Sequence, residues 1–294
     1  MLVKASKCPA DIMQNVSNFI YMREDFRKEN LPRCSTPAEI GRELTASDSW
    51  FVFADRQPTA KLVIIAVFKL ERAGQTAKLS QLCVNNDDSF DSVISGLRRE
   101  FGELRISNLC LRVRPADVAR YAAKGFERGD TYDRFSRTPA ESNMIPILPL
   151  TSVALKDLSV LAKLMYAAYA KTKYGFPDMQ STEEILRATM SGDKGEYLSN
   201  ASFASGGPPN LVSACLITAD APGDAKIEQL FTHPLYRARG LATTEIAAGM
   251  NWLTASGVKS LSAWDRESND VVRRLLTKMG FRQDQTAVEM FARS

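Results

Sequence analysis

The stretch Lys226-Ile-Glu-Gln-Leu-Phe-Thr-His-Pro-Leu-Tyr-Arg-Ala-Arg-Gly-Leu-Ala-Thr243 carries the pattern around which the rest of the chain is organised. Its first residues predict a strand that ends at His233-Pro234, because proline has no N–H for a strand ladder. A turn that contains Gly240 follows and leads directly into a helical run, Thr243–Thr254. The stretch therefore predicts a strand, a glycine turn and a helix in immediate succession.

A turn between a strand end and a helix start directs several backbone N–H groups the same way, with the positive end of the helix dipole behind them. Arg237 and Arg239 add positive charge that suits phosphate oxygens. From these residues alone we expect a site for a phosphate or pyrophosphate group.

The six residues Arg-x-x-Gly-x-Ala that end at Ala242 resemble the acyl-CoA pyrophosphate loop of the GNAT (GCN5-related) N-acetyltransferases. The approach Leu-Phe-Thr-His-Pro-Leu-Tyr-Arg is similar to that of the family. After the helix, Val258–Trp264 predicts the next strand, and the spacing Asn269-x-x-Val-x-x-Leu-x-x-Lys-x-Gly-Phe281 is similar to the closing helix of the family.

The competing interpretation is a βαβ unit with an ordinary glycine turn. A nucleotide-binding βαβ protein is a further alternative, but a Walker lysine and a G-x-G-x-x-G are missing.

Composition sets limits that agree with this resemblance. A length of 294 residues suggests two domains, and the net charge of +4 without long Lys/Arg runs disfavours nucleic acid as a partner. No apolar run is long enough to span a bilayer, and the first residues lack the apolar core of a signal peptide. Five scattered cysteines and a single histidine, His233, predict no metal site. We expect free thiols in a reducing cytosol and no membrane partner.

The order of predicted elements repeats along the chain, which indicates an internal duplication. Its clearest marker is the similarity of Arg120–Asp130 and Arg274–Asp284, each a helix end followed by Gly-Phe. The predicted fold class is therefore α/β (α+β), with two tandem GNAT-like domains, each a mixed, mostly antiparallel twisted sheet flanked by helices. The predicted domains are residues 1–138 and 145–294, joined by a linker near Ser136–Met144.

Periodicity and turn residues place the individual elements. The strands are expected at 2–5, 49–54, 61–69, 78–84, 109–113, 132–135, 147–148, 196–204, 210–218, 227–232 and 258–264. The helices are expected at 11–28, 36–44, 92–101, 115–124, 155–171, 182–190, 243–254 and 269–279. Thr36 is the predicted N-cap of its helix, and Thr286–Arg293 is the predicted edge strand that closes the second sheet.

Only the second half is expected to bind the cofactor. In the first half, the strand that ends at Val84 is followed by Asn85-Asn-Asp-Asp88 and not by Arg-x-x-Gly-x-Ala. Two carboxylates would repel a pyrophosphate at short range. The first half is therefore predicted to be a degenerate copy.

The resemblance implies acetyl-CoA as co-substrate, no metal, and direct attack by an acceptor amine in a ternary complex. Backbone groups of Leu230–Thr232 would follow the pantetheine arm, and one N–H there would polarise the thioester oxygen. Amides of Ala238–Thr243 would hold the pyrophosphate, and Asn269 would contact the cofactor near its thiol end or at its pantetheine. The expected cofactor-binding residues are Leu230, Phe231, Thr232, Arg237, Ala238, Arg239, Gly240, Leu241, Ala242, Thr243 and Asn269.

Glu228 and Thr232 are the expected catalytic residues. Family members often place a glutamate at the position of Glu228, where it would act as a base through water; the competing interpretation is a carboxylate paired with Lys or Arg. The family's usual general acid, a tyrosine, is replaced here by Leu276. The acid would then be Tyr166, Tyr169, Ser268 or water.

Two functions follow from these residues. The first is an acyl-CoA-dependent N-acyltransferase that moves acetyl to a primary amine, and the second is a non-catalytic acyl-CoA binding or sensing module. The acceptor is not identified by the sequence, and both a monomer and a homodimer are compatible with two packed halves.

Overall fold

The structure is a computed structural model that describes residues 2–24, 34–46, 50–56, 62–73, 76–84, 94–96, 107–170, 172, 176, 178–221 and 223–293. Contacts divide the chain into two compact units, Met1–Thr131 with Ala287–Ser294 (unit 1) and Tyr132–Thr286 (unit 2). The predicted helix 92–101, apart from residues 94–96, and the predicted carboxylate turn Asn85–Asp88 lie outside the described residues.

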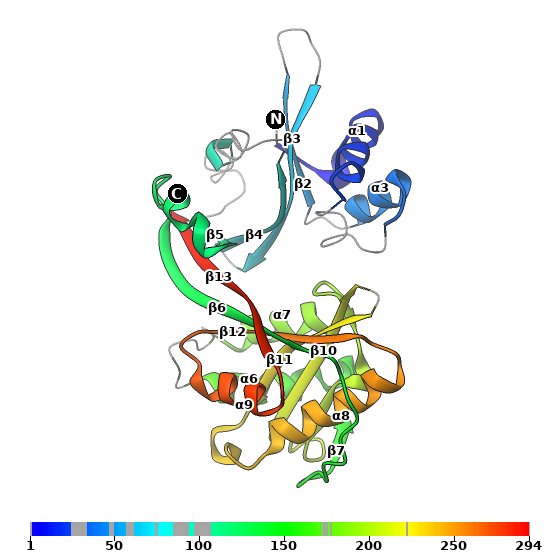
Figure 1. Cartoon of the computed structure of the whole chain (residues 1–294), viewed down its shortest axis with the longest axis vertical. Helices are drawn as coiled ribbons and strands as arrows, with labels where there is room; N and C mark the ends of the chain where they lie inside the picture. The colour runs from blue at the N-terminus through cyan, green and yellow to red at the C-terminus, as the bar shows by residue number, and fades with distance from the viewer. Residues whose placement is uncertain are drawn as a thin grey trace. The chain divides into compact units, whose positions relative to one another are not determined.

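Unit 1 is a mixed sheet with helices packed on it (Figure 1). Its strand order is β1-β2-β3-β4-β5-β13, antiparallel throughout except for the parallel pair β4–β5. The elements are β1 (Leu2–Lys4), η1 (Ala5–Lys7), α1 (Ala10–Tyr21), α3 (Pro37–Ala46), β2 (Trp50–Arg56), β3 (Leu62–Ala73), β4 (Thr76–Val84), β5 (Asn108–Val113), η2 (Pro115–Asp117) and α5 (Val118–Ala122), with parts of β6 (Glu127–Arg137) and β13 (Arg282–Arg293).

The start of α3 confirms the predicted cap. The Glu39 backbone N–H donates to Thr36 Oγ1 at 3.3 Å, and the Thr36 N–H donates to Glu39 Oε2 at 3.0 Å, so two N–H groups at the helix end are satisfied reciprocally. Figure 1 shows α3 side by side with α1. Their apolar stripes, which include Val16 and Ile40, form one buried cluster with β2.

The strand predicted at Thr286–Arg293 exists, but its predicted role as an edge strand of the second sheet is wrong. Its residues Val288–Arg293 pair antiparallel with Asn108–Val113 of β5, in unit 1. The reason is packing: Val288, Met290 and Ala292 enter the buried cluster of unit 1. The division into units therefore gives residues 287–294 to unit 1, whereas the sequence-based domains 1–138 and 145–294 stay a prediction.

Unit 2 is a second mixed sheet, with strand order β6-β12-β11-β10-β9-β7 and β8 paired to β10. All its pairs are antiparallel except β11–β12. The elements after β6 are β7 (Leu150–Ser152), η3 (Leu155–Asp157), α6 (Leu158–Tyr169), α7 (Met179–Met190), β8 (Glu196–Tyr197), η4 (Ser199–Ala201), β9 (Phe203–Ser205), β10 (Ser213–Ala221), β11 (Asp224–Thr232), η5 (Pro234–Tyr236), α8 (Leu241–Ala255), β12 (Ser260–Arg266), α9 (Asp270–Lys278) and the first part of β13. The predicted mixed, mostly antiparallel architecture is confirmed in both units.

Helices cover both faces of the sheet in unit 2. Leu216 and Ala214 of β10 pack with α6 and α7, whereas Cys215 and Ile217, which alternate with them, pack with α8 and α9. Helix α8 approaches closely because Gly249 has no side chain: a Cβ there would lie 2.7 Å from the Ala201 carbonyl oxygen. Figure 1 shows α8 alongside β10 and β11.

A β-bulge at Glu228 changes which residues of β11 face α8. Ile227 pairs with Ile217 and Gln229 with Leu216, so Glu228 is an extra residue without a partner on β10. Before the bulge, Ile227 packs in the cluster under α8; after it, Phe231 packs in the cluster under α6. The bulge thereby turns Thr232 toward α8.

The two units share one local arrangement. In unit 1, Thr76–Leu79 of β4 pair in parallel with Asn108–Leu111 of β5, and in unit 2, Asp224–Ile227 of β11 pair in parallel with Ser260–Ala263 of β12. Each parallel pair is four residues long and follows an antiparallel hairpin. This agreement in register supports the duplication predicted from the sequence.

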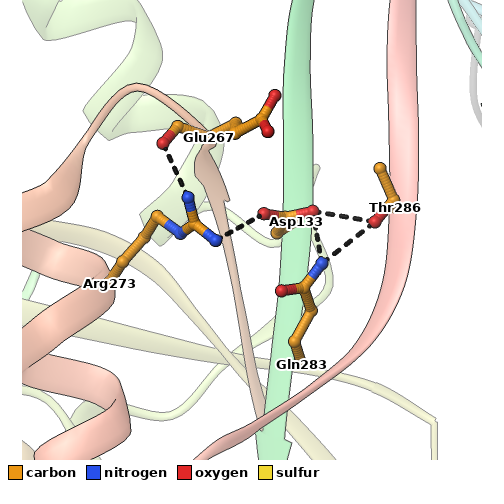
Figure 2. Close-up of polar contacts among 5 residues, drawn as sticks. All are labelled: Asp133, Glu267, Arg273, Gln283 and Thr286. Atoms are coloured by element: carbon orange, nitrogen blue, oxygen red, sulfur yellow. Dashed lines mark hydrogen bonds and ion pairs between the residues drawn. The ribbon is translucent and has the colours of Figure 1, made fainter.

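One buried carboxylate ties three elements of unit 2 together (Figure 2). Asp133 of β6 is 3% exposed. Its Oδ1 accepts hydrogen bonds from Gln283 Nε2 at 2.7 Å and Thr286 Oγ1 at 2.8 Å, while its Oδ2 lies 3.3 Å from an Arg273 guanidinium nitrogen. Arg273 also donates to the Glu267 carbonyl oxygen. This cluster fixes α9 and β13 against β6.

We expect Asp133→Ala to destabilise the protein by roughly 2–4 kcal/mol, because it leaves a half-buried guanidinium without this counter-charge and removes the shared acceptor of Gln283 and Thr286. Thermal unfolding followed by circular dichroism checks this. Asp224→Ala, at an exposed aspartate of the same unit, is the matched control and should change stability by less than about 0.5 kcal/mol. Equal effects of the two substitutions would contradict a structural role of the cluster.

Candidate functional site

Residues from separate segments of unit 2 line one cavity of about 440 Å³. It lies between the end of α6, the second half of β11, the turn before α8 and the start of α9. All eleven residues expected to bind the cofactor line it: Leu230, Phe231, Thr232, Arg237, Ala238, Arg239, Gly240, Leu241, Ala242, Thr243 and Asn269. The remaining lining comes from residues such as Tyr169, Tyr236 and Leu275.

One wall of the cavity is a strand edge. In the described part of the chain, β11 pairs with β12 only over Asp224–Ile227, whereas β12 pairs with β6 along its other edge from Leu261 to Arg266. Beyond the bulge, Gln229–Thr232 pair only with β10. The two strands thus separate, and one edge of Gln229–Thr232 has no strand partner. An extended ligand with amide groups can pair with such an edge as an added strand would.

A second wall is the N-terminus of α8. Gly240 is its N-cap, with φ of +79°, a conformation that suits glycine, and no side chain caps the helix. The first backbone hydrogen bond of the helix runs from the Thr244 N–H to the Gly240 carbonyl oxygen. The N–H groups of Leu241–Thr243 therefore have no acceptor within the helix. With no acidic residue in the first turn, this end of the dipole is positive and suits an anion.

The loop before α8 is held in a specific shape. Ala238 has φ of +57°, the only positive φ of a non-glycine residue in the described ranges. Such a conformation costs roughly 1 kcal/mol and persists where its surroundings impose it. Arg237 contributes: its guanidinium donates to the Ala168 carbonyl oxygen at 2.6 Å and to the Thr232 carbonyl oxygen at 3.3 Å. Arg239 stacks on the Tyr236 ring, 5.2 Å from its centroid.

Glu228 does not line the cavity. It is half-buried at the bulge, where its Oε2 lies 2.8 Å from Lys226 Nζ. This is the ion pair that the sequence offered as the competing interpretation. The predicted base and the predicted cofactor residues therefore lie on the same strand, but Glu228 is separated from the cavity wall.

Among the candidates for a general acid, Tyr169 and Ser268 line the cavity, whereas Tyr166 does not. The Tyr169 ring packs edge-on against Phe176 with centroids 5.4 Å apart. Burial raises the pKa of the Tyr169 phenol, and the nearby Asp265 carboxylate raises it further, so the phenol keeps its proton at neutral pH. Leu276 is fully buried in the apolar cluster under α8 and α9.

Asn269 connects the cavity to a buried carboxyl. Its side-chain amide donates to Asp265 Oδ1 at 3.1 Å, at the end of β12. Burial raises the pKa of Asp265, and the hydrogen bond from Asn269 opposes that shift. The contact fixes the orientation of the Asn269 amide in the cavity wall.

Comparison with known proteins agrees with this geometry. Residues 176–281, which hold the strand edge, the turn and α9, match the model of the acetyltransferase (GNAT) family. No curated protein matches the chain.

Solved structures extend the GNAT fold to the whole chain. A tandem GNAT protein from the clavulanic acid biosynthesis pathway matches with a TM-score of 0.67 at 13% identity, covering 100% of this chain and 97% of that one. A GCN5-related N-acetyltransferase from Sphaerobacter thermophilus matches with a TM-score of 0.63 at 13% identity, covering 88% and 85%. A putative acetyltransferase from Pyrococcus horikoshii matches with a TM-score of 0.59 at 11% identity, covering 100% and 89%. At these identities the likeness shows the fold: the chain is a tandem GNAT fold.

Two further findings concern the described residues only. Among them, no helix is long and apolar enough to cross a membrane, and no cluster of three or more His, Cys, Asp or Glu could hold a metal ion.

The GNAT domain also contains a polar group that sequence reasoning missed. Glu245, in the second turn of α8, is fully buried. Its Oε1 accepts from the Ser205 hydroxyl at 2.6 Å and the Ser205 backbone N–H at 3.1 Å, and its Oε2 lies 3.0 Å from Ser213 Oγ. Burial raises the pKa of Glu245 to about 8, against the lowering effect of the serine hydrogen bonds. The signal in the sequence was a single carboxylate within the apolar run of α8.

We expect Glu245→Gln to become progressively more stable than wild type as pH rises from about 4.5 to about 8. In this window the unfolded chain releases the Glu245 proton and the folded protein keeps it, so wild type loses about 1.4 kcal/mol per pH unit that the glutamine variant does not lose. Urea unfolding at several pH values measures the difference. Exposed Glu267→Gln should leave the slope unchanged, and parallel slopes for wild type and Glu245→Gln would contradict a protonated Glu245.

Proposed function

We propose that this protein is an acyl-CoA-dependent N-acyltransferase that moves acetyl from acetyl-CoA to a primary amine by direct attack in a ternary complex. The observation that carries the proposal is one cavity in which an unpaired strand edge meets an uncapped helix N-terminus. An extended amide chain that ends in a diphosphate has the groups that suit these two walls.

The cofactor would be bound mainly by the backbone. Amides of Ala238–Thr243 would hold the pyrophosphate, and the free edge of Leu230–Thr232 would hold the pantetheine arm. Arg239 would add charge, whereas Arg237 would act by fixing the loop, because its guanidinium is bonded to two carbonyl oxygens. Most of the rate enhancement would come from holding the thioester and the amine in attack geometry.

Two side chains would move protons. Glu228 would accept the proton of the acceptor amine through water, after exchange of its contact with Lys226. Tyr169 would protonate the leaving thiolate, because it is the tyrosine among the earlier candidates that lines the cavity and its pKa is raised. Ser268 would be the alternative donor.

A non-catalytic acyl-CoA sensing module is the second candidate. It is favoured by the separation of Glu228 from the cavity wall and by the buried leucine at position 276. Release of CoA in the presence of an amine acceptor separates the two functions, since a sensor binds acyl-CoA without turnover.

The proposal keeps the cytosolic location expected from the sequence. Among the described cysteine side chains, Cys8, Cys34, Cys110 and Cys215 form no disulfide bond, as a reducing compartment favours. The acceptor amine and the choice between monomer and homodimer stay open within this proposal.

Calorimetric titration of acetyl-CoA tests the cofactor site. Wild type should bind at a single saturable site, and Gly240→Glu should bind roughly a hundredfold more weakly or not at all, because it places a negative side chain at the anion-binding turn. Gly257→Glu is the matched control: it adds the same charge at a positive-φ glycine, just beyond the opposite end of α8, where nothing lies near the new side chain. It should bind as wild type does.

Three results would count against the proposal. Wild type without any binding would exclude both the transferase and the sensor. Two equivalent sites would contradict a degenerate first half. Equal losses in Gly240→Glu and Gly257→Glu would mean that the loss comes from helix destabilisation and not from the turn.

Turnover with a panel of primary amines, followed by CoA release, tests the proton-transfer residues. Glu228→Gln and Tyr169→Phe should each lower kcat by roughly a hundredfold, with little change in the Kd of acetyl-CoA. Tyr166→Phe, one turn earlier on the same helix and away from the cavity, should keep wild-type kcat. A wild-type protein that binds acetyl-CoA but releases no CoA with any amine would favour the sensing module.

A further inference from the structure

A continuous chain of hydrogen-bonding groups connects a buried carboxyl to the wall of the cavity. Glu245 Oε2 lies 3.0 Å from Ser213 Oγ, and Ser213 Oγ lies 2.8 Å from Thr232 Oγ1. Glu245 and Ser213 are fully buried, and Thr232 lines the cavity. The bulge at Glu228 brings Thr232 to this side of the sheet, where it pairs directly across from Ser213.

The donors in this chain can be assigned one by one. Glu245 Oε1 already accepts two hydrogen bonds, from the hydroxyl and the backbone N–H of Ser205. A protonated carboxyl therefore carries its hydrogen on Oε2 and donates it to Ser213 Oγ. The Ser213 hydroxyl then donates to Thr232 Oγ1 at 2.8 Å, which is closer than its other acceptor, the Phe231 carbonyl oxygen at 3.4 Å, and the Thr232 hydrogen is left to donate into the cavity.

An ionised carboxylate reverses the donor–acceptor direction of each hydrogen bond in this chain. The carboxylate can only accept, so the Ser213 hydroxyl donates to Glu245 Oε2. Ser213 Oγ then accepts from the Thr232 hydroxyl, and Thr232 presents only a lone pair to the cavity. The same three residues thus offer a donor in one state and an acceptor in the other.

We propose that Glu245 is a positioning residue whose protonation state, transmitted through Ser213, sets whether the Thr232 hydroxyl donates or accepts a hydrogen bond in the cavity. This inference rests on the proposed acyl-CoA site. The ligand group concerned is a carbonyl oxygen of the acyl-CoA arm, which only accepts hydrogen bonds. The neutral carboxyl is therefore the binding-competent state, and its ionisation weakens binding.

Burial of Glu245 supports this assignment, since it raises the pKa to about 8 and keeps the donor form predominant at neutral pH. Of the described groups on the elements packed against α8, Cys215 on β10 is the titratable neighbour, and its own pKa is raised by burial and by Glu245. Strand β9 and the 3₁₀ helix η4 carry no titratable side chain. On β11, Lys226 and Glu228 pair with each other, and Arg237 on the loop is bonded to two carbonyl oxygens.

Acetyl-CoA titrations at pH 7.5 and pH 9.5 test the inference. The Kd of wild type should rise about tenfold, because a carbonyl oxygen loses a donor and meets a lone pair instead. Acetyl-CoA has no free thiol, and its ribose phosphomonoester titrates near pH 6, below this window. Glu245→Gln should show no such rise: its amide nitrogen donates permanently to Ser213 and its oxygen still accepts from Ser205, as the neutral carboxyl does.

Two further variants separate this chain from other effects of pH. Thr232→Val removes the hydroxyl at nearly constant shape, so its Kd at pH 7.5 should already match the weaker value of wild type at pH 9.5 and should not change with pH. Ser213→Ala breaks the connection and should also remove the pH dependence. Thermal unfolding well above the titration temperature establishes that each variant is folded.

The outcomes are distinguishable. If wild type does not bind acetyl-CoA at pH 7.5, the proposed function fails and this inference fails with it. If wild type binds but Glu245→Gln weakens with pH to the same extent, the proposed function stands and the role of Glu245 is overturned. A pH-dependent Kd in Thr232→Val equal to that of wild type would overturn it as well.

Discussion

The site depends on one constraint, the separation of β11 from β12 after four paired residues. A strand paired on both edges has no backbone groups left for a ligand. Here Asp224–Ile227 are paired on both sides, whereas Gln229–Thr232 are paired only with β10. The edge that is released runs toward the uncapped N-terminus of α8, and the cavity lies where the two meet. Everything proposed for the function uses one of these two features.

The bulge at Glu228 explains why residues of β11 that would otherwise share one face pack against helices on both faces of the sheet. Without an extra residue, positions 227 and 231 would face the same side of the sheet; with it, Ile227 packs under α8 and Phe231 under α6. The same shift sends Thr232 toward α8, where its hydroxyl joins the hydrogen-bonded chain of Ser213 and Glu245. Burying a carboxyl beneath the first turn of α8 is tolerable because the group stays neutral and each of its oxygens has a hydrogen-bond partner.

The duplication is visible as a repeated register and not as repeated chemistry. Both units contain an antiparallel hairpin followed by a parallel pair of four residues, β4–β5 and β11–β12. The last strand of the chain does not follow the duplication, because its residues Val288–Arg293 pair within the sheet of unit 1. A fold can thus be copied while the loop that would bind an anion is kept in only one half of the sequence.

The sequence alone determined the features that depend on neighbouring residues. The reciprocal cap of Thr36 and Glu39, the strand–turn–helix at Lys226–Thr243 and the mixed architecture of both halves follow from local spacing, because turns, caps and helix starts form within a few residues. The resemblance carried by that stretch named the eleven expected cofactor residues, and all of them line the cavity.

Only the tertiary structure decided the contacts between distant residues. Ser205 and Glu245 are 40 positions apart, and the partner of β13 is β5, far away in the sequence. A single-residue bulge reversed the faces of β11, moved Thr232 to the α8 side and left Glu228 beside Lys226. Such outcomes depend on how strands pair and how cores fill, and alternation along one strand cannot reveal which neighbour, or which face, the fold selects.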